Sequence, residues 1–142
     1  MFREDLLKGR AIFLTGGGTG LGKSMSLRFA GLGARMFLVG RREEPLREVC
    51  DEILRMGGLA AYSTCDVRDY SAVETAVAKA EDQFGEIDTV VNNAAGNFMA
   101  RTETLSANAF NAVVAIVLNG TFHCTQALAK NCLLYTSDAA DE

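Results

Sequence analysis

The sequence has no tryptophan, a single proline and four cysteines among its 142 residues. Cys50, Cys65, Cys124 and Cys132 share no Cys-x-x-Cys spacing, so we expect reduced structural thiols and no metal site. The longest apolar run, residues 112–118, is far shorter than the roughly 20 residues of a bilayer-spanning helix, so we expect no membrane insertion. The basic residues are scattered and the formal net charge is -4, which argues against a nucleic-acid partner.

The beginning of the chain contains no apolar signal segment, because acidic side chains stand at positions 4 and 5. We therefore predict a cytoplasmic location. Apolar residues make up 49% and charged residues 23% of the sequence, which is typical of a packed globular domain and excludes a disordered or fibrous chain. The length allows one ordinary domain at most.

Residues 132–142 differ in pattern from the rest of the chain, and they predict neither an amphipathic helix nor a strand. The string Cys-Leu-Leu-Tyr-Thr-Ser-Asp-Ala-Ala-Asp resembles one reading frame of a transposon-end oligonucleotide used to prepare sequencing libraries. We hypothesise that these residues are translated adapter and that the natural sequence stops near residue 131, with a natural acidic tail as the alternative. Sequencing the source DNA without that oligonucleotide would contradict the hypothesis if the same residues reappeared.

Short apolar segments alternate with segments of helical periodicity along the chain. The predicted strands cover residues 10–15, 35–39, 59–64 and 87–91. The predicted helices cover residues 20–32, 43–56, 71–84 and 106–130, the third capped by Ser71 and the fourth by Ser106. This alternation predicts an α/β fold, a doubly wound parallel sheet of Rossmann type that is truncated after the fourth strand and the following helix. Residues 1–131 would then be the N-terminal part of a single domain, with ligands at the carboxyl ends of the strands.

A glycine cluster follows the first predicted strand, over residues Thr15–Gly22. Glycines let the backbone turn tightly and bring amide groups and a helix N-terminus against a phosphate. Residues 17–24 satisfy Gly-x-x-x-x-Gly-Lys-Ser, a triphosphate-binding loop with Lys23 at the phosphate and Ser24 on magnesium. The alternative is a dinucleotide-binding loop of the form Thr-Gly-x-x-x-Gly-x-Gly that begins at Thr15.

The ends of the later strands favour the dinucleotide loop. A triphosphate-hydrolysing site needs an acidic strand end to hold magnesium, but the fourth strand ends in Asn92 and Asn93, which leaves only Asp66 after the third. The second strand ends in Arg41 and Arg42. A guanidinium there accommodates a ribose 2′-phosphate, whereas a carboxylate would hold the 2′-hydroxyl of NAD, so we expect NADP. Two solvated arginines are the alternative.

Four motifs in this order resemble the short-chain dehydrogenase/reductase family: Thr15–Gly22, Asp66-Val67, Asn92–Gly96 and Asn119. The resemblance implies that the glycine loop holds the pyrophosphate, that Asp66 and Val67 contact the adenine, and that the asparagine motif supports the sheet and lines the cofactor. With Arg41 from the argument above, the expected NADP-binding residues are Thr15, Gly16, Gly18, Thr19, Gly20, Leu21, Gly22, Arg41, Asp66, Val67, Asn93, Ala94, Ala95 and Gly96.

Within that family, segments Thr15–Lys23, Asn92–Phe98 and Val117–Thr121 are most similar to the 2,4-dienoyl-CoA reductases. The resemblance implies NADPH-dependent reduction of a 2,4-dienoyl-CoA thioester in unsaturated fatty-acid degradation, with an acyl-CoA partner and a homo-oligomeric, commonly tetrameric, full-length protein. Asn119 matches the family's catalytic asparagine, a neutral donor to the charge that develops on the thioester oxygen. The family's Tyr and Lys are expected beyond residue 131, so we expect this chain alone to be inactive.

Other interpretations stay open at this point. A sibling enzyme could act on a carbonyl or alcohol, such as an oxoacyl thioester or a polyol. From different classes, a P-loop nucleotide triphosphatase and a nucleotide-sensing protein without catalysis also fit a glycine loop. Lys23 is expected near a phosphate, and His123, one helical turn after Asn119, is expected to be a packed histidine and not an acid or base.

Overall fold

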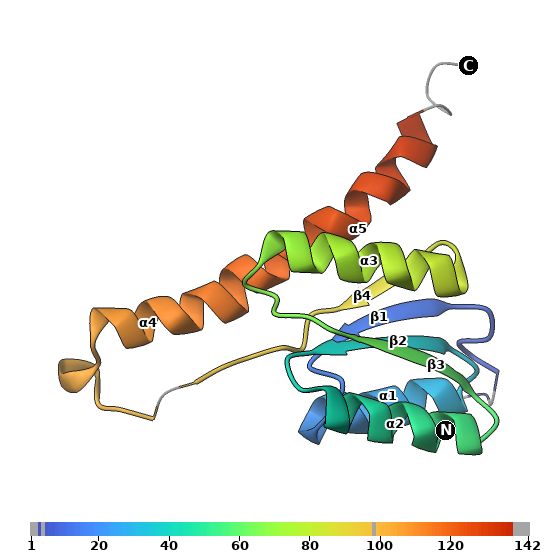
Figure 1. Ribbon diagram of the computed structural model, residues 1–142, viewed down its shortest axis with the longest axis horizontal. Helices are drawn as coiled ribbons and strands as arrows, with labels where there is room; N and C mark the ends of the chain where they lie inside the picture. The colour runs from blue at the N-terminus through green and yellow to red at the C-terminus, as the bar shows by residue number, and fades with distance from the viewer. Residues whose placement is uncertain (1–2, 4, 98, 138–142) are drawn as a thin grey trace.

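The computed structural model describes residues 3, 5–97 and 99–137, with side chains described up to Lys130. Its centre is a sheet of four parallel strands in the order β3-β2-β1-β4 (Figure 1). The strands are β1 (Ala11–Thr15), β2 (Arg35–Gly40), β3 (Leu59–Thr64) and β4 (Thr89–Val91). All five residues of β1 are buried, which explains why its sequence is continuously apolar and does not alternate.

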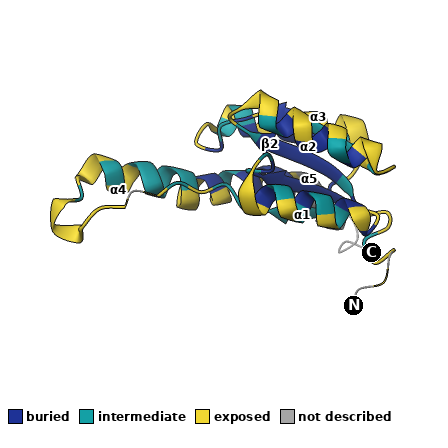
Figure 2. Cartoon of the chain, turned by 90° about the horizontal axis from the view of Figure 1, so that it is seen from below, coloured by how far each residue is buried: buried dark blue, intermediate teal, exposed yellow. Residues whose placement is uncertain are grey.

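Helices cover both faces of the sheet. The helices α1 (Gly20–Gly31) and α2 (Glu43–Arg55) pack against one face. The helices α3 (Tyr70–Phe84) and α5 (Gly120–Ser137) pack against the other, where they contact each other. Figure 1 shows the sheet between these helix layers, and Figure 2 shows its strands as buried. The doubly wound, Rossmann-type parallel sheet expected from the sequence is therefore confirmed.

Alternate residues of the central strands supply the two cores. Phe13 and Phe37, whose stacked ring centroids lie 5.8 Å apart, belong to the core with α3 and α5. Leu14 and Leu38 belong to the core with α1 and α2. Burying a side chain of this size contributes about 1.5–3 kcal/mol, so both layers hold the strands in register.

The segment between β4 and α5 leaves the sheet. It contains a 3₁₀ turn, η1 (Thr102–Thr104), the helix α4 (Ala107–Val114) and a π-helical turn, η2 (Ala115–Asn119). Ser106 caps α4 as the sequence predicts, since its Oγ accepts a hydrogen bond from the Ala109 amide at 3.1 Å. Figure 1 shows α4 projecting beyond the sheet, and none of its residues is buried.

Residues Ala107–Lys130 form one continuous helix that is long and apolar enough, by length and composition alone, to cross a membrane. The sequence-based expectation rested on the uninterrupted apolar run and did not detect this segment. Core helices of soluble proteins pass the same test, and 22% of the apolar window is buried here. A single helix of this kind does not establish a membrane protein.

Three local predictions need correction. Asp69, and not Ser71, caps α3, because its carboxylate accepts hydrogen bonds from the amides of Ser71 at 3.0 Å and Ala72 at 3.3 Å. The fourth strand is shorter than expected and begins at Thr89. The last helix continues through residue 131 to Ser137, although no amphipathic pattern announces it. The remainder of the proposed adapter segment, residues 138–142, lies outside the described residues.

Candidate functional site: a cavity at the carboxyl ends of the strands

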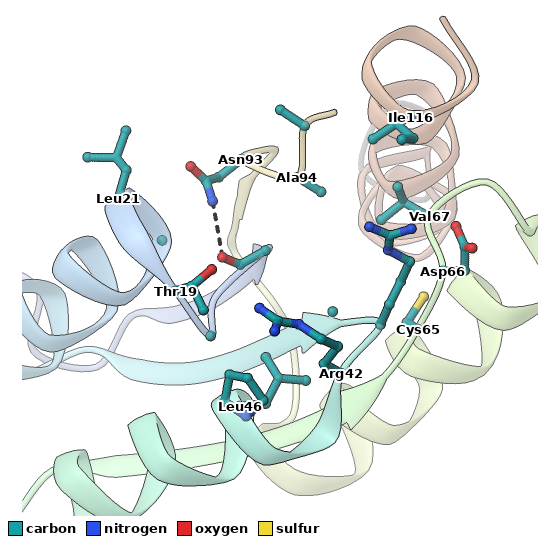
Figure 3. A pocket seen from close by; sticks show the side chains of 17 residues that line it. Thr19, Leu21, Arg42, Leu46, Cys65, Asp66, Val67, Asn93, Ala94 and Ile116 are labelled. Carbon is teal, nitrogen blue, oxygen red and sulfur yellow. Dashed lines mark hydrogen bonds between the residues drawn. The ribbon is translucent and has the colours of Figure 1, made fainter. Parts of the chain in front are cut away.

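A cavity of about 580 Å³ opens at the carboxyl ends of the strands. It lies where the chain order reverses, between β1 and β4, which is where open α/β sheets bind ligands. Figure 3 shows that the side chains around it come from the glycine loop, from the start of α2, from the β3–α3 turn and from η2. The lining residues are Gly16, Gly18, Thr19, Leu21, Gly22, Gly40, Arg41, Arg42, Pro45, Leu46, Cys65, Asp66, Val67, Asn93, Ala94, Ala95 and Ile116.

Hydrogen bonds tie the ends of β1 and β4 together beneath this cavity. The Thr15 Oγ1 accepts from the backbone amides of Asn93 at 2.9 Å and Ala94 at 2.8 Å. The Asn93 side chain in turn donates its Nδ2 to the carbonyl oxygens of Thr15 at 3.0 Å and Gly16 at 3.2 Å. Thr15 itself is buried, so its role is to position the loop and not to touch a ligand.

Two glycines of the loop are required by close approach. A Cβ at Gly22 would overlap the Gly16 carbonyl oxygen and would lie 2.7 Å from the Asn93 Nδ2. A Cβ at Gly18 would lie 2.9 Å from the Pro45 Cβ. Gly16 also has a positive φ of 68°, which favours glycine. The loop therefore holds the start of α1 directly against the β1–β4 junction.

The N-terminus of α1 has the features of an anion-binding site. Thr19 is its N-cap and makes no side-chain hydrogen bond to the helix, and the first turn contains no acidic residue. The first amides of an uncapped helix carry partial positive charge and lack helical acceptors, so they bind phosphate well.

Lys23 does not take the position predicted for it. Its Nζ forms an ion pair with Glu52 of α2 at 2.9 Å, and Lys23 does not line the cavity. The expectation of a lysine at the phosphate is therefore wrong, because the helix places this side chain toward α2. Among the residues that the structure describes, no three His, Cys, Asp or Glu side chains gather as a metal-binding group.

Arg41 and Arg42 follow β2 and both line the cavity. Both residues are exposed. Figure 3 shows Arg42 above Leu46, at the side of the cavity where α2 starts. The sequence places only Arg41 in the expected cofactor set, whereas the structure brings both guanidinium groups to the rim. Two such groups suit a phosphate that is only partly removed from water.

Asp66 follows β3 and lines the same cavity. Arg68 forks onto its carboxylate, with Nε at 2.9 Å from one oxygen and Nη2 at 2.5 Å from the other. The hydrogen bonds from Arg68 hold the pKa of the Asp66 carboxyl below its ordinary value, so this group is an anion and acceptor at neutral pH. Burial raises the pKa of the neighbouring Cys65 thiol to about 11, which makes Cys65 a wall residue and not a nucleophile.

The structure brings most of the predicted cofactor-binding residues to one cavity. Three do not line it: Thr15 lies beneath the loop, Gly20 begins α1 with a φ of 53°, and Gly96 packs against Ile116. Sequence reasoning did not assign Gly40, Arg42, Pro45, Leu46, Cys65 and Ile116. Arg42 could have been found from its neighbour Arg41, and Pro45 from its place in the first turn of the predicted second helix. Ile116 gave no signal, because its position depends on the π turn.

Asn119 is separate from this group. It is the last residue of η2, it is exposed, and it does not line the cavity. The catalytic role that the resemblance implies for Asn119 stays a prediction. Phe98, at the end of the second motif similar to the dienoyl-CoA reductases, lies outside the described residues.

The cavity residues fit a dinucleotide that carries an additional phosphate group. Uncapped amides at α1 and a glycine loop free of side chains suit a pyrophosphate, and the arginine pair suits a second anionic group. Asp66 and Val67 line the cavity as well, and the Asp66 carboxylate is an acceptor there.

Comparison with known proteins agrees with this geometry. The chain is 41% identical over 135 residues to the probable 2,4-dienoyl-CoA reductase 3 of Caenorhabditis elegans, covering 94% of this chain and 44% of that protein. It is 43% identical over 122 residues to the probable 2,4-dienoyl-CoA reductase of Bacillus subtilis, covering 86% of this chain and 48% of that protein. The resemblance inferred from the motifs is thus confirmed, and the chain spans about half the length of these relatives.

Solved structures show the same likeness. A short chain dehydrogenase from Bacillus anthracis superposes with a TM-score of 0.85 at 41% identity, covering 91% of this chain and 54% of that one. A citronellol catabolism dehydrogenase from Pseudomonas aeruginosa superposes with a TM-score of 0.86 at 34% identity, covering 92% of this chain and 54% of that one.

The family defined as short chain dehydrogenase matches residues 10–139. This match contradicts the triphosphate-loop hypothesis. The chain belongs to the short-chain dehydrogenase family.

Proposed function

We propose that this chain forms the cofactor-binding part of an NADPH-dependent oxidoreductase that reduces a 2,4-dienoyl-CoA thioester. The observation that carries the proposal is the cavity at the strand ends, with an uncapped helix N-terminus on one side and Arg41 and Arg42 on another. The names of the relatives at 41% and 43% identity support the substrate class. We also propose a soluble cytoplasmic enzyme that works as a homo-oligomer.

NADPH fits the cavity better than NADH. The strand end that contacts the adenosine ribose in folds of this type carries Arg41 and Arg42 in place of a carboxylate. A 2′-phosphate between two guanidinium groups gains charge-assisted hydrogen bonds, whereas a 2′-hydroxyl carries no charge to pair with them. The α1 amides would hold the pyrophosphate, and Asp66 and Val67 would contact the adenine.

When bound, the nicotinamide supplies a hydride to the substrate. The protein's contribution is to hold the cofactor and to place neutral donors where negative charge develops on the thioester oxygen. Asn119 is the described residue proposed for that role. Its amide can donate a hydrogen bond without changing its own charge.

A sibling activity on an alcohol or carbonyl is the second candidate. The likeness to a citronellol catabolism dehydrogenase, at 34% identity and a TM-score of 0.86, favours it, because citronellol is an alcohol. Calorimetric titration of the NADP⁺-loaded chain with a 2,4-dienoyl-CoA and with a 3-oxoacyl-CoA distinguishes the two. Tighter binding of the dienoyl thioester supports the reductase, and tighter binding of the oxoacyl thioester supports the sibling.

Calorimetric titration with NADPH, NADH and magnesium ATP tests the cofactor. We expect NADPH to bind about tenfold or more tightly than NADH, since a charge-assisted hydrogen bond contributes about 1.5–3 kcal/mol. The double variant Arg41→Ala with Arg42→Ala should remove that preference, whereas Arg55→Ala, at the exposed end of α2, should keep it. Equal affinity for NADH, or tighter binding of magnesium ATP, would overturn the proposal.

A further inference from the structure

The start of α5 packs unusually closely on the turn between β3 and α3. Gly120, the first residue of α5, is buried. A Cβ at this position would lie 2.6 Å from the Val67 Cγ2 and 3.1 Å from the Val67 Cβ. Since Val67 is itself buried and β-branched, it cannot move aside easily. Glycine therefore permits the approach.

His123 follows Gly120 on α5 by three residues and holds the same turn. Its Nδ1 lies 2.8 Å from the carbonyl oxygen of Val67. A carbonyl oxygen only accepts hydrogen bonds, so the Nδ1 must carry the proton and donate. The His123 ring also meets the Tyr70 ring edge-on, with centroids 5.5 Å apart, which fixes the plane of the imidazole over the beginning of α3.

The turn held in this way is a wall of the cavity. Asp66 and Val67 both line it, and Ile116, from the π turn just before α5, lines it as well. Figure 3 shows Val67 close to the helix that carries Ile116. One continuous helix, Ala107–Lys130, thus supports this wall with Ile116 on the cavity side and with His123 from behind.

We propose that His123 is a positioning residue for the adenine end of the bound cofactor. It holds the Val67 carbonyl through Nδ1 and thereby sets the place of the Asp66–Val67 wall, without touching the cofactor. This inference rests on the proposed function in one respect, namely that the cavity takes NADPH with its adenine against this wall. It goes beyond the sequence-based expectation that His123 is a packed histidine and not an acid or base.

The test measures the binding of two separate probes, each of which represents one half of the cofactor. Adenosine 2′,5′-bisphosphate represents the adenine half and reduced nicotinamide mononucleotide the other half. His123→Phe keeps the ring volume and removes the donor, whereas His123→Asn keeps a donor at the place of Nδ1. Gln126→Ala, an exposed position on the same helix, is the matched control.

His123→Phe should weaken binding of the bisphosphate by about fivefold to tenfold, because the Asp66–Val67 wall loses the contact that sets its place, an effect no larger than the contribution of one hydrogen bond. His123→Asn should stay within about twofold of the unchanged chain, as should Gln126→Ala, and none of the three should change binding of the mononucleotide. An unchanged His123→Phe, or equal weakening for both halves, would overturn the proposal, because a merely structural residue affects both.

A second measurement tests the contact without any ligand. Nitrogen-15 NMR of the imidazole should show the proton on Nδ1 of His123, and a proton on Nε2 alone would overturn the proposal even if His123→Phe fails to fold. Failure of the unchanged chain to bind NADPH or the bisphosphate would instead overturn the proposed function. The proton position then still decides whether His123 holds the Val67 carbonyl.

Discussion

The junction of β1 with β4 is buried and hydrogen-bonded, whereas the segment that projects from the sheet exposes large apolar side chains. At the junction, Thr15 is buried and its hydroxyl accepts two backbone amides. In the projecting segment, here called the arm and defined as residues 99–119, Met99, Phe110 and Leu118 are 99%, 58% and 65% exposed. Figure 2 shows the arm as mainly exposed or intermediate residues, in contrast to the buried strands.

Under the proposed function, this difference separates the expected cofactor-binding residues from Asn119, the residue proposed for catalysis. Apart from Ile116 at the end of the arm, the residues that line the cavity belong to the glycine loop and to the ends of β2, β3 and β4, which pack on one another, and to the start of α2. Asn119 is the last residue of the arm and is exposed. The neighbouring Val117 and Leu118 are 43% and 65% exposed, so their burial contributes little free energy. We therefore expect binding to be a property of the junction, and the predictions below test how far the arm is independent of it.

The largest expected effect comes from truncating matched leucines in the two regions. Leu38 is fully buried between the sheet and α1–α2, whereas Leu118 of the arm is 65% exposed. Leu38→Ala should lower the free energy of unfolding by about 2–5 kcal/mol, and Leu118→Ala should change it by less than about 0.5 kcal/mol. Urea unfolding measures both. Equal losses would mean that the arm is packed as tightly as the core.

A methyl group in the glycine loop should have the next largest effect. Gly22→Ala forces the Cβ against the Gly16 carbonyl and the Asn93 amide, so we expect about 1–3 kcal/mol of destabilisation together with loss of measurable NADPH binding. Gly31→Ala is the control, because no atom lies within 4 Å of its added Cβ. It should gain up to about 1 kcal/mol from helix propensity and leave the affinity for NADPH unchanged. Similar results for both variants would contradict the close packing.

Thr15→Val tests the hydrogen bonds at the junction at nearly constant volume. The amides of Asn93 and Ala94 would lose their acceptor, and an unsatisfied buried donor costs about 1–3 kcal/mol. Thr75→Val, which removes an exposed hydroxyl on α3 that donates to the Ser71 carbonyl at 2.9 Å, should cost less than about 0.5 kcal/mol. Thermal unfolding compares the two variants. A Thr15→Val protein as stable as the unchanged one would show that the β1–β4 tie is dispensable.

The smallest expected effect is on the stability of the folded chain at low pH. Hydrogen bonds from Arg68 lower the pKa of the Asp66 carboxyl in the folded chain. The contribution of this pair to stability is therefore present above the ordinary carboxylate pKa of about 3.9 and is lost as the pH falls through the lowered folded value. Asp66→Asn and Arg68→Gln should each flatten the dependence of unfolding free energy on pH below about pH 4. An unchanged slope in both variants would contradict the pairing.

The sequence was sufficient to predict the fold and most of the cavity because both depend on local patterns. Gly16 and Gly22 were identified from the spacing of the loop and Gly18 from the family resemblance, and the structure shows that Gly18 and Gly22 are enforced by close backbone or side-chain approach. Asp66 and Asn93 were placed correctly because they follow strands, and parallel strands end at the same edge of the sheet.

Features that depend on how helices cross were not predictable in this way. Lys23 pairs with Glu52 because α1 packs beside α2, and no spacing along the chain encodes that neighbour. Ile116 enters the cavity and His123 reaches the Val67 carbonyl because of the π turn Ala115–Asn119 and the approach of Gly120. The cap of α3 was misassigned to Ser71, since Asp69 offers a stronger acceptor two residues earlier.

Mapping NADPH onto the nitrogen-15-labelled chain by amide chemical shifts tests the central claim most directly. The account predicts shifts at the glycine loop, at Arg41 and Arg42, and at Asp66 and Val67, with none in α4. A second cavity, of about 630 Å³ between α2 and α3 and lined in part by Asp51 and Lys79, provides the internal comparison. Shifts centred there, or spread along α4, would contradict a preformed cofactor site at the β1–β4 junction.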